Sequence, residues 1–181
     1  VVADGTLPLA GWPEAGAPGV GFDGAGNGYI MGLHFRRSPS LRGAVYVHKT
    51  TDGGRTFQAP MLAYNGNDLP DKPLLTVDQR TSGRFAGSLY ITFTPFFSSL
   101  SGLQCIHSRD GGQTWSRPVR IGSGQGTSPA IGPNGEVYVA WQAGNAIQFN
   151  AAVDGGVGGG DRSQHQRVAR DEGSAPFVSG H

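Results

Sequence analysis

Residues 108–115 read SRDGGQTW, and the same pattern returns in residues 50–57 as TTDGGRTF. Residues 152–159, AVDGGVGG, keep only its Asp-Gly-Gly centre. The aspartate side chain can accept hydrogen bonds from backbone N–H groups just beyond it, and the glycines allow the positive φ at which a hairpin reverses. The aromatic residue that ends the two intact copies is expected to pack beneath the turn. A hairpin signal that recurs in this way indicates a repeat architecture.

The segments that flank the three copies also repeat. A proline-led apolar segment begins each unit, at Pro18, Pro73 and Pro129, and a fourth such segment begins at Pro176. A short stretch with a tyrosine follows in each unit, at Tyr29, Tyr90 and Tyr138. Two apolar residues then precede each copy, two positions apart: Val45 and Val47, Leu103 and Cys105, Ile147 and Phe149. Because alternate residues of a strand face the same side, we expect these positions and the tyrosines to be core.

Each unit therefore reads as four short strands, with the Asp-Gly-Gly turn between the third and the fourth. The 31 glycines and 12 prolines suit a chain of many short strands, and no segment shows sustained helical periodicity. The sequence predicts an all-β fold. Cys105, the one cysteine, falls on a core position of a third strand, where it is expected to act as a small hydrophobic residue.

The pattern Ser/Thr-x-Asp-x-Gly-x-Thr-Trp/Phe resembles the Asp box of the sialidase-superfamily (BNR-repeat) β-propellers. The resemblance implies a single partial propeller domain over residues 1–181, with about three four-stranded antiparallel blades of a six-bladed ring. The units are expected at about 17–70, 71–126 and 127–173, with a further blade starting at 174–181. The rest of the propeller would come from a longer chain or another copy. The structural Asp-box residues implied are Thr50, Asp52, Gly54, Thr56, Phe57, Ser108, Asp110, Gly112, Thr114, Trp115, Asp154 and Gly156.

The resemblance leaves two functions open. One is a sialidase-like glycoside hydrolase of the exo-α-sialidase type, acting on or binding extracellular glycans. The other is a non-catalytic propeller that binds glycans or proteins. The Arg-Ile-Pro motif that carries the first substrate arginine of true sialidases does not occur; the residues before the strand-leading prolines are Ala17, Lys72, Ser128 and Ala175. Either function implies a secreted or cell-surface protein, because Asp-box propellers are commonly exported.

Functional residues are expected opposite the Asp boxes, where the connections between strands 4 and 1 and between strands 2 and 3 lie. The connection expected over residues 61–72 holds the catalytic candidates Tyr64, Asp68 and Asp71. Tyr64 is either a nucleophile or an exposed loop residue. Substrate-binding candidates are Arg36, Arg37, Lys72, Asp171 and Glu172. Arg36 and Arg37 either bind a carboxylate through their planar guanidinium groups or form a solvated pair. Phe96 and Phe97 suit either a sugar-stacking platform or a plug over the core.

Composition argues against several other classes. A net charge of +1 predicts no nucleic-acid partner, and no apolar run is long enough for a membrane span. The five histidines have no metal-ligand spacing, and no cofactor motif occurs, so neither a metal nor a cofactor is expected.

Overall fold

The structure is a computed structural model that describes residues 4–153 and residue 155. This part of the chain consists of antiparallel β-strands and contains no helix, which confirms the predicted all-β class. The first sheet has the order β1-β2-β3-β4, from Glu14–Phe22, Gly28–Arg36, Arg42–Thr50 and Met61–Tyr64. The second has the order β5-β6-β7-β8, from Leu69–Val77, Leu89–Phe96, Leu103–Ser108 and Val119–Gly122. The third has the order β9-β10-β11, from Gln125–Ile131, Val137–Ala143 and Ala146–Ala152.

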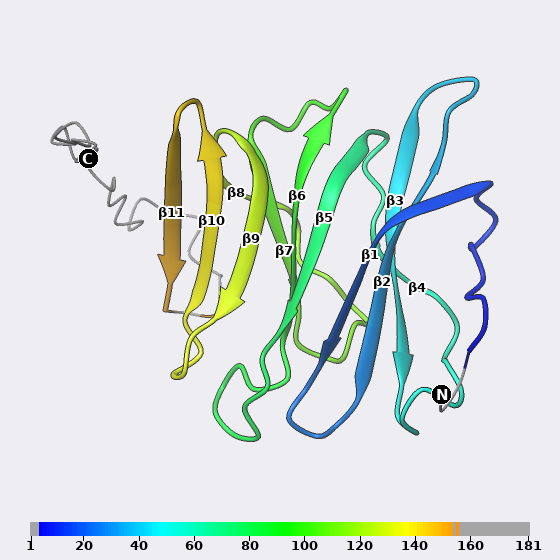
Figure 1. The fold of residues 1–181 in the computed structure, drawn as a ribbon, viewed down its shortest axis with the longest axis vertical. Helices are drawn as coiled ribbons and strands as arrows, with labels where there is room; N and C mark the ends of the chain where they lie inside the picture. The colour runs from blue at the N-terminus through cyan, green and yellow to red at the C-terminus, as the bar shows by residue number, and fades with distance from the viewer. Residues whose placement is uncertain (1–3, 154, 156–181) are drawn as a thin grey trace, which may run out of the picture.

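The three sheets stand side by side, face against face, with their first strands β1, β5 and β9 next to one another (Figure 1). This arrangement is consistent with successive blades of a propeller. The four-stranded pattern holds for the first two sheets, and the described part of the third has three strands. No closed ring is formed by the described residues. The strands begin at Glu14, Leu69 and Gln125, each two or three residues before the expected unit starts.

Two apolar layers fill the spaces between the sheets, because alternate residues of each strand face the neighbouring sheet. The first layer includes Tyr29, Met31, Val45, Val47, Leu89, Ile91, Phe93 and Ile106. The second includes Tyr90, Leu103, Cys105, Val137, Val139 and Trp141. Cys105 is buried, as predicted, and burial raises the pKa of its thiol to about 12, so the thiol stays protonated at neutral pH. The aromatic residues of the repeated turns, Phe57 and Trp115, were expected to be largely buried but are only half-buried.

The third sheet departs from the expected burial. Tyr138 and Ile147 correspond to buried residues of the first two sheets, yet they are 43% and 62% exposed. They lie on the face turned away from the second sheet, since Val137, Val139 and Trp141 on the alternate positions fill the layer between the two. The prediction that Tyr138 and Ile147 are core is wrong for the described chain, because no described sheet covers this face.

A β-bulge recurs in the first strand of all three described sheets. Its position shows which residues of the three repeat units are equivalent. The pairing shifts around Ala17-Pro18 in β1, around Lys72-Pro73 in β5 and around residues 126–127 in β9. The first residue of each bulge has a positive φ, which is 46° at Ala17, 47° at Lys72 and 66° at Gly126. Gly126 is thus the structural counterpart of Lys72. Pro129 lies beyond the bulge, so the expected equivalence of Pro129 with Pro18 is wrong.

The two intact copies of the turn motif have the same hydrogen-bond pattern at the lower end of the stack. The Thr50 and Ser108 hydroxyls accept the N–H of the second glycine at 2.9 and 2.8 Å. They donate to Asp52 and Asp110, both at 2.8 Å. The two carboxylates in turn accept hydrogen bonds from the backbone and side chain of Thr56 and Thr114. The turns therefore close the hairpins, and Asp154 and Gly156 of the third copy lie outside the described residues.

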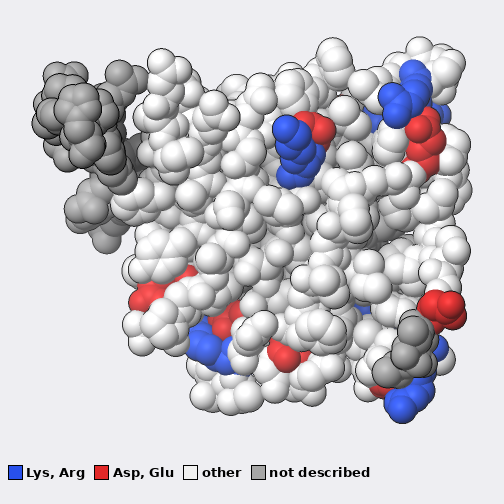
Figure 2. Space-filling view, viewed as in Figure 1, with Lys and Arg blue, Asp and Glu red and all other residues white. Residues whose placement is uncertain are grey.

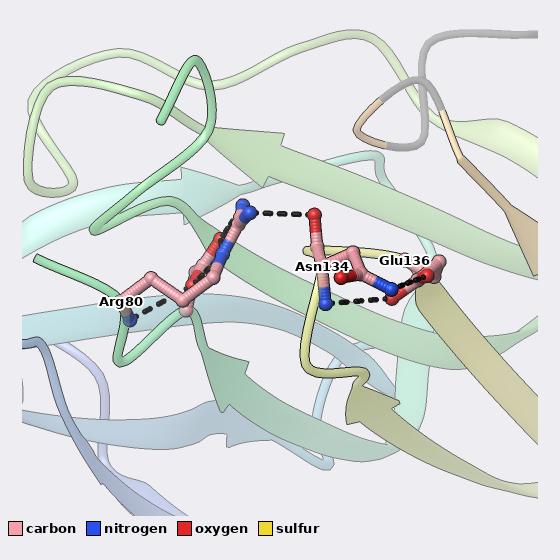
Figure 3. Close-up of polar contacts among 4 residues, drawn as sticks. Arg80, Asn134 and Glu136 are labelled. Atoms are coloured by element: carbon pink, nitrogen blue, oxygen red, sulfur yellow. Dashed lines mark hydrogen bonds and ion pairs between the residues drawn. The ribbon is translucent and has the colours of Figure 1, made fainter. Parts of the chain in front are cut away.

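A polar network ties the lower ends of the second and third sheets together (Figure 3). The Arg80 guanidinium donates to both carboxylate oxygens of the buried Asp78, at 3.0 Å from Nε and 2.6 Å from Nη2. Its Nη1 donates to the Asn134 carbonyl at 2.5 Å. The Asn134 amide donates to Glu136 at 2.8 Å, which holds the turn between β9 and β10. Arg80 thereby links two sheets through one side chain.

Candidate functional site

The candidate site lies at the upper end of the stack in Figure 1, opposite the Asp-Gly-Gly turns. Five connections meet there, at residues 37–41, 65–68, 97–102, 123–124 and 144–145. Among the described residues, five other than glycine have a positive φ: Ala17, Asn67, Lys72 and Phe97 at this end, and Ala10 in the N-terminal segment. In the described turns at the lower end, every residue with a positive φ is a glycine. Strained backbone is typical of ligand-binding sites, because it persists only where the surrounding structure imposes it.

Lys72 and Asp71 lie near the upper end of β5, the middle one of the three first strands. Lys72 is exposed, and its left-handed backbone interrupts the regular alternation of the strand. Asp71 is half-buried and pairs with Thr94 of β6. Figure 2 shows one basic and one acidic group side by side over the upper part of β5, on a face that otherwise carries few charges there.

Phe97 follows β6 directly and belongs to the same sheet as Lys72. Its side chain is 77% exposed, and its φ is 60°, an unusual value for an aromatic residue. The Phe96 and Phe97 ring centroids are 6.5 Å apart, and Phe96 pairs with Leu69 at the start of β5. Of the two expected roles, an exposed stacking platform suits Phe97 better than a plug over the core.

Tyr64 is not an exposed loop residue, which corrects one of the two expectations for it. It is the last residue of β4 and is buried, and its ring contacts Phe93 with a centroid distance of 4.6 Å. Its hydroxyl donates a 2.7 Å hydrogen bond to Asp68, which is also buried. Burial, and then the hydrogen bond to Asp68, raise the pKa of Tyr64 well above its usual value. A neutral phenol engaged in this way is a poor nucleophile.

The connection expected over residues 61–72 is short. Residues 61–64 and 69–72 belong to β4 and β5, so only 65–68 connect the strands. Tyr64 and Asp68 are brought together, while no contact joins this pair to Asp71 or Lys72 within hydrogen-bond distance. Pro70 and Pro73 both belong to β5, an edge strand of its sheet, where Pro70 pairs with Pro95 and Pro73 lies in the bulge.

The two arginines differ in environment. Arg37 is exposed, forms a 3.1 Å ion pair with Glu14 and stacks over Phe35 at 5.2 Å, so it matches the solvated alternative. Arg36 belongs to the end of β2 and is half-buried. Its Nε atom is buried and has no hydrogen-bond partner among the described residues. Asp171 and Glu172 lie outside the described residues, and their place relative to this end stays a prediction.

Several residues that matter here were not found from the sequence. Glu14 pairs with Arg37 from a strand whose start the sequence did not mark. Asp78 and Arg80 looked like ordinary loop residues, since their partner Asn134 comes from another sheet. His34 and His48 meet on the outer face of the first sheet, and their spacing carries no ligand motif. Within the described residues no group of three or more histidine, cysteine or acidic side chains is arranged to hold a metal ion, and no helix could cross a membrane.

Comparison with known proteins shows similarity at the level of the fold. No protein-family model and no curated protein matches the chain. Its structure is similar to that of a protein of unknown function from Dyadobacter fermentans, with a TM-score of 0.59, 18% identity and 81% of this chain covered. It is also similar to the Hadza microbial sialidase Hz136, with a TM-score of 0.51, 16% identity and 77% covered. The chain spans 49% and 31% of the lengths of these two proteins. It is thus a distant structural neighbour of a sialidase.

Proposed function

We propose that this chain is a three-sheet section of a sialidase-like β-propeller whose upper end binds glycans without hydrolysing them. The exposed Phe97 platform carries the proposal. An aromatic ring held in a strained, solvent-facing position offers an apolar surface to one face of a sugar, and Lys72 of the same sheet can hydrogen-bond its hydroxyl or carboxylate groups. The fold it shares with a sialidase supports the same class of ligand.

The described residues favour binding over hydrolysis. A glycosidase of the sialidase type needs a nucleophile, a carboxylic acid and substrate arginines that converge on one sugar. Tyr64 is buried against Asp68, and Arg37 is paired with Glu14. Asp71 and Arg36 are the remaining candidates in the described chain, and no hydrogen bond or ion pair joins them. A single platform with one lysine is sufficient for weak, reversible recognition.

The repeat also supports a longer propeller. Tyr138, Ile147 and Phe149 occupy the positions at which the first sheet buries Tyr29, Val45 and Val47 against the next sheet. The second sheet buries Tyr90, Leu103 and Cys105 at the same positions. A fourth sheet of the same kind, from a longer chain or another copy, would bury them in turn. We propose that such a sheet completes this face, and that the whole protein is secreted or displayed at the cell surface, where extracellular glycans are found.

The test is a glycan-binding measurement on the purified chain, with sialylated and neutral oligosaccharides on an array and the positive ligands followed by calorimetry. Phe97→Ala and Lys72→Ala should each weaken binding at least tenfold. Phe22→Ala, which removes an exposed aromatic ring at the lower end of β1, is the matched control and should bind like the unaltered chain.

Absence of binding to every glycan, or equal loss in the Phe22→Ala control, would contradict the glycan site. A fluorogenic sialoside assay separates the two functions. Turnover that Asp71→Asn abolishes would replace the non-catalytic proposal with a hydrolase. Glycan binding that Phe97→Ala leaves intact would show that Phe97 is not the platform.

A further inference from the structure

The outer face of the first sheet carries a histidine pair that the proposed glycan site does not use. His34 of β2 and His48 of β3 are 3% and 2% exposed, and their ring centroids are 6.3 Å apart. Tyr46 stacks on His34 with a centroid distance of 4.7 Å. These residues alternate with Val45 and Val47, which face the second sheet, so the histidines point to the side where no described sheet packs.

An N-terminal segment covers this face. We call residues 4–13 the strap; Figure 1 shows its described residues running along the side of the first sheet that is remote from β5–β8. The Leu9 carbonyl accepts a 2.9 Å hydrogen bond from Nδ1 of His34, and Trp12 Nε1 lies 3.4 Å from the Tyr46 hydroxyl. Leu9 and Trp12 also close a tight turn, in which Trp12 N–H donates to the Leu9 carbonyl at 3.0 Å. The strap is thus hydrogen-bonded to His34 and Tyr46, two side chains of the face that it covers.

With the strap in place, we infer that both rings are neutral at pH 7, because their pKa values lie below the usual 6.5. A carbonyl can only accept, so Nδ1 of His34 carries the hydrogen, and its Nε2 is the basic atom. Both ring nitrogens of His48 are buried without a hydrogen-bond partner among the described residues. Burial lowers the pKa of His34 below its usual 6.5. Burial, and then the proximity of His34, lower the pKa of His48.

The groups that face the pair offer no compensating negative charge. The strap contributes Leu9 and Trp12, and β3 contributes the neutral Tyr46. Glu14, where β1 begins, is held by Arg37, and no described carboxylate lies within ion-pair distance of either imidazole. In the second sheet the position of His48 is taken by Ile106, which packs in the apolar core. An ionisable ring therefore stands in the first sheet where the second sheet has an aliphatic side chain.

We propose that the strap is an acid-released cover: protonation of His34 and His48 opens residues 4–13 and exposes the outer face of the first sheet. The direction of the pH dependence follows from the linkage between protonation and opening of the strap. A base with a lowered pKa in the closed form takes up its proton more readily in the open form, so closure is favoured above pH 6.5 and is lost as the pH falls below it. Opening would enlarge an apolar surface that already includes Val20, Phe22 and Leu62.

Hydrogen exchange of the full 181-residue chain between pH 7.5 and 5.0, corrected for the intrinsic rate, tests the proposal. The open fraction of the strap should rise by up to about tenfold per pH unit for each histidine below pH ~6.5, while β2 and β3 stay protected. His34→Asn keeps a donor for the Leu9 carbonyl, and His48→Ile copies Ile106. The double variant should keep the strap closed and remove its pH dependence.

His107→Gln is the matched control, since His107 is a half-buried histidine in the second sheet with a lowered pKa, and it should leave the response unchanged. A strap that opens equally at both pH extremes, or a double variant that responds like the unaltered chain, would overturn the proposal. The proposal would also be overturned if β2 and β3 lost protection together with the strap, because that result would indicate acid unfolding of the whole sheet. If the double variant does not fold, an NMR titration of the unaltered chain decides: a pKa of 6.5 or above for both histidines rules the cover out.

Discussion

Ala17 and Lys72 occupy the same bulge of neighbouring sheets and share the same left-handed backbone, with φ values of 46° and 47°. In β9 the equivalent residue is Gly126, for which this conformation is unstrained. The strain is therefore a property of the bulge and not of the side chain that stands there. It also places Lys72, and with it the proposed glycan site, at a position that the whole repeat maintains.

Ala17→Gly should stabilise the chain. An L-residue in the left-handed region costs about 1–2 kcal/mol, and glycine removes this strain. Because glycine also loses more conformational entropy on folding, the net increase in the free energy of unfolding should be about 0.5 kcal/mol. Urea unfolding measures the change. The control is Ala15→Gly at a position of β1 with ordinary backbone, where the same substitution should destabilise. A loss at both positions would show that the bulge carries no strain.

Ser108→Ala should destabilise the hairpin between β7 and β8. The buried hydroxyl accepts the Gly112 N–H and donates to Asp110, so its removal leaves a backbone donor unpaired, at a cost of about 1–3 kcal/mol. Denaturant titration gives the difference from the unaltered chain. Ser99→Ala, at an exposed position in the β6–β7 connection, should change stability by less than about 0.5 kcal/mol. Equal effects would mean that the turn is not held by its hydroxyl.

Asp110→Asn should flatten the loss of stability in acid. Burial raises the pKa of Asp110, but hydrogen bonds from Thr114 and Ser108 outweigh it and hold the pKa below the usual 3.8. A carboxyl with a lowered pKa stabilises the folded state above its usual pKa and loses this contribution as the pH falls below it. Urea midpoints between pH 5 and pH 2 should therefore fall less steeply in the variant. Parallel curves would contradict the assignment.

Leu103→Ala and Ile147→Ala should differ sharply although the two residues hold the same repeat position. Leu103 is fully buried against the third sheet, and its truncation should cost about 2–5 kcal/mol. Ile147 is 62% exposed, so its truncation should cost less than about 0.5 kcal/mol in this chain. A large cost at Ile147 would show that a partner already covers the third sheet in solution, which analytical ultracentrifugation would reveal.

Tyr64→Phe should destabilise the chain without affecting ligand binding. It removes the 2.7 Å hydrogen bond to Asp68 and leaves a buried carboxylate without that donor, at a cost of about 1–3 kcal/mol. Tyr138→Phe, at an exposed position, is the control. If Tyr64→Phe instead kept full stability and abolished glycan binding or sialoside turnover, Tyr64 would be a site residue after all.

Repetition in the sequence was enough to predict the all-β class, the order of strands in the first two sheets and the burial of Val45, Val47, Leu103 and Cys105. These features are local: alternation decides which side of a strand is apolar, and Asp-Gly-Gly decides where a hairpin reverses. The places where this reasoning failed depend on neighbours. Pro129 was misaligned because a bulge is invisible in the spacing of prolines, and Tyr138 was misjudged because burial requires a sheet that packs against it.

In the candidate site, too, some features are local in the sequence and others depend on neighbouring sheets. The sequence was enough to propose the end of the repeat opposite the Asp-Gly-Gly turns as the functional one, with Lys72 and Phe97 among its candidates, because residue types and connections are readable from a repeat. Only the tertiary structure decided that Tyr64 faces Asp68 in the core, that Arg37 is paired with Glu14, and that His34 and His48 meet on the outer face of the first sheet. Exposure, pairing and the pKa of a side chain are set by groups distant in the sequence, whose positions follow from the packing of whole sheets.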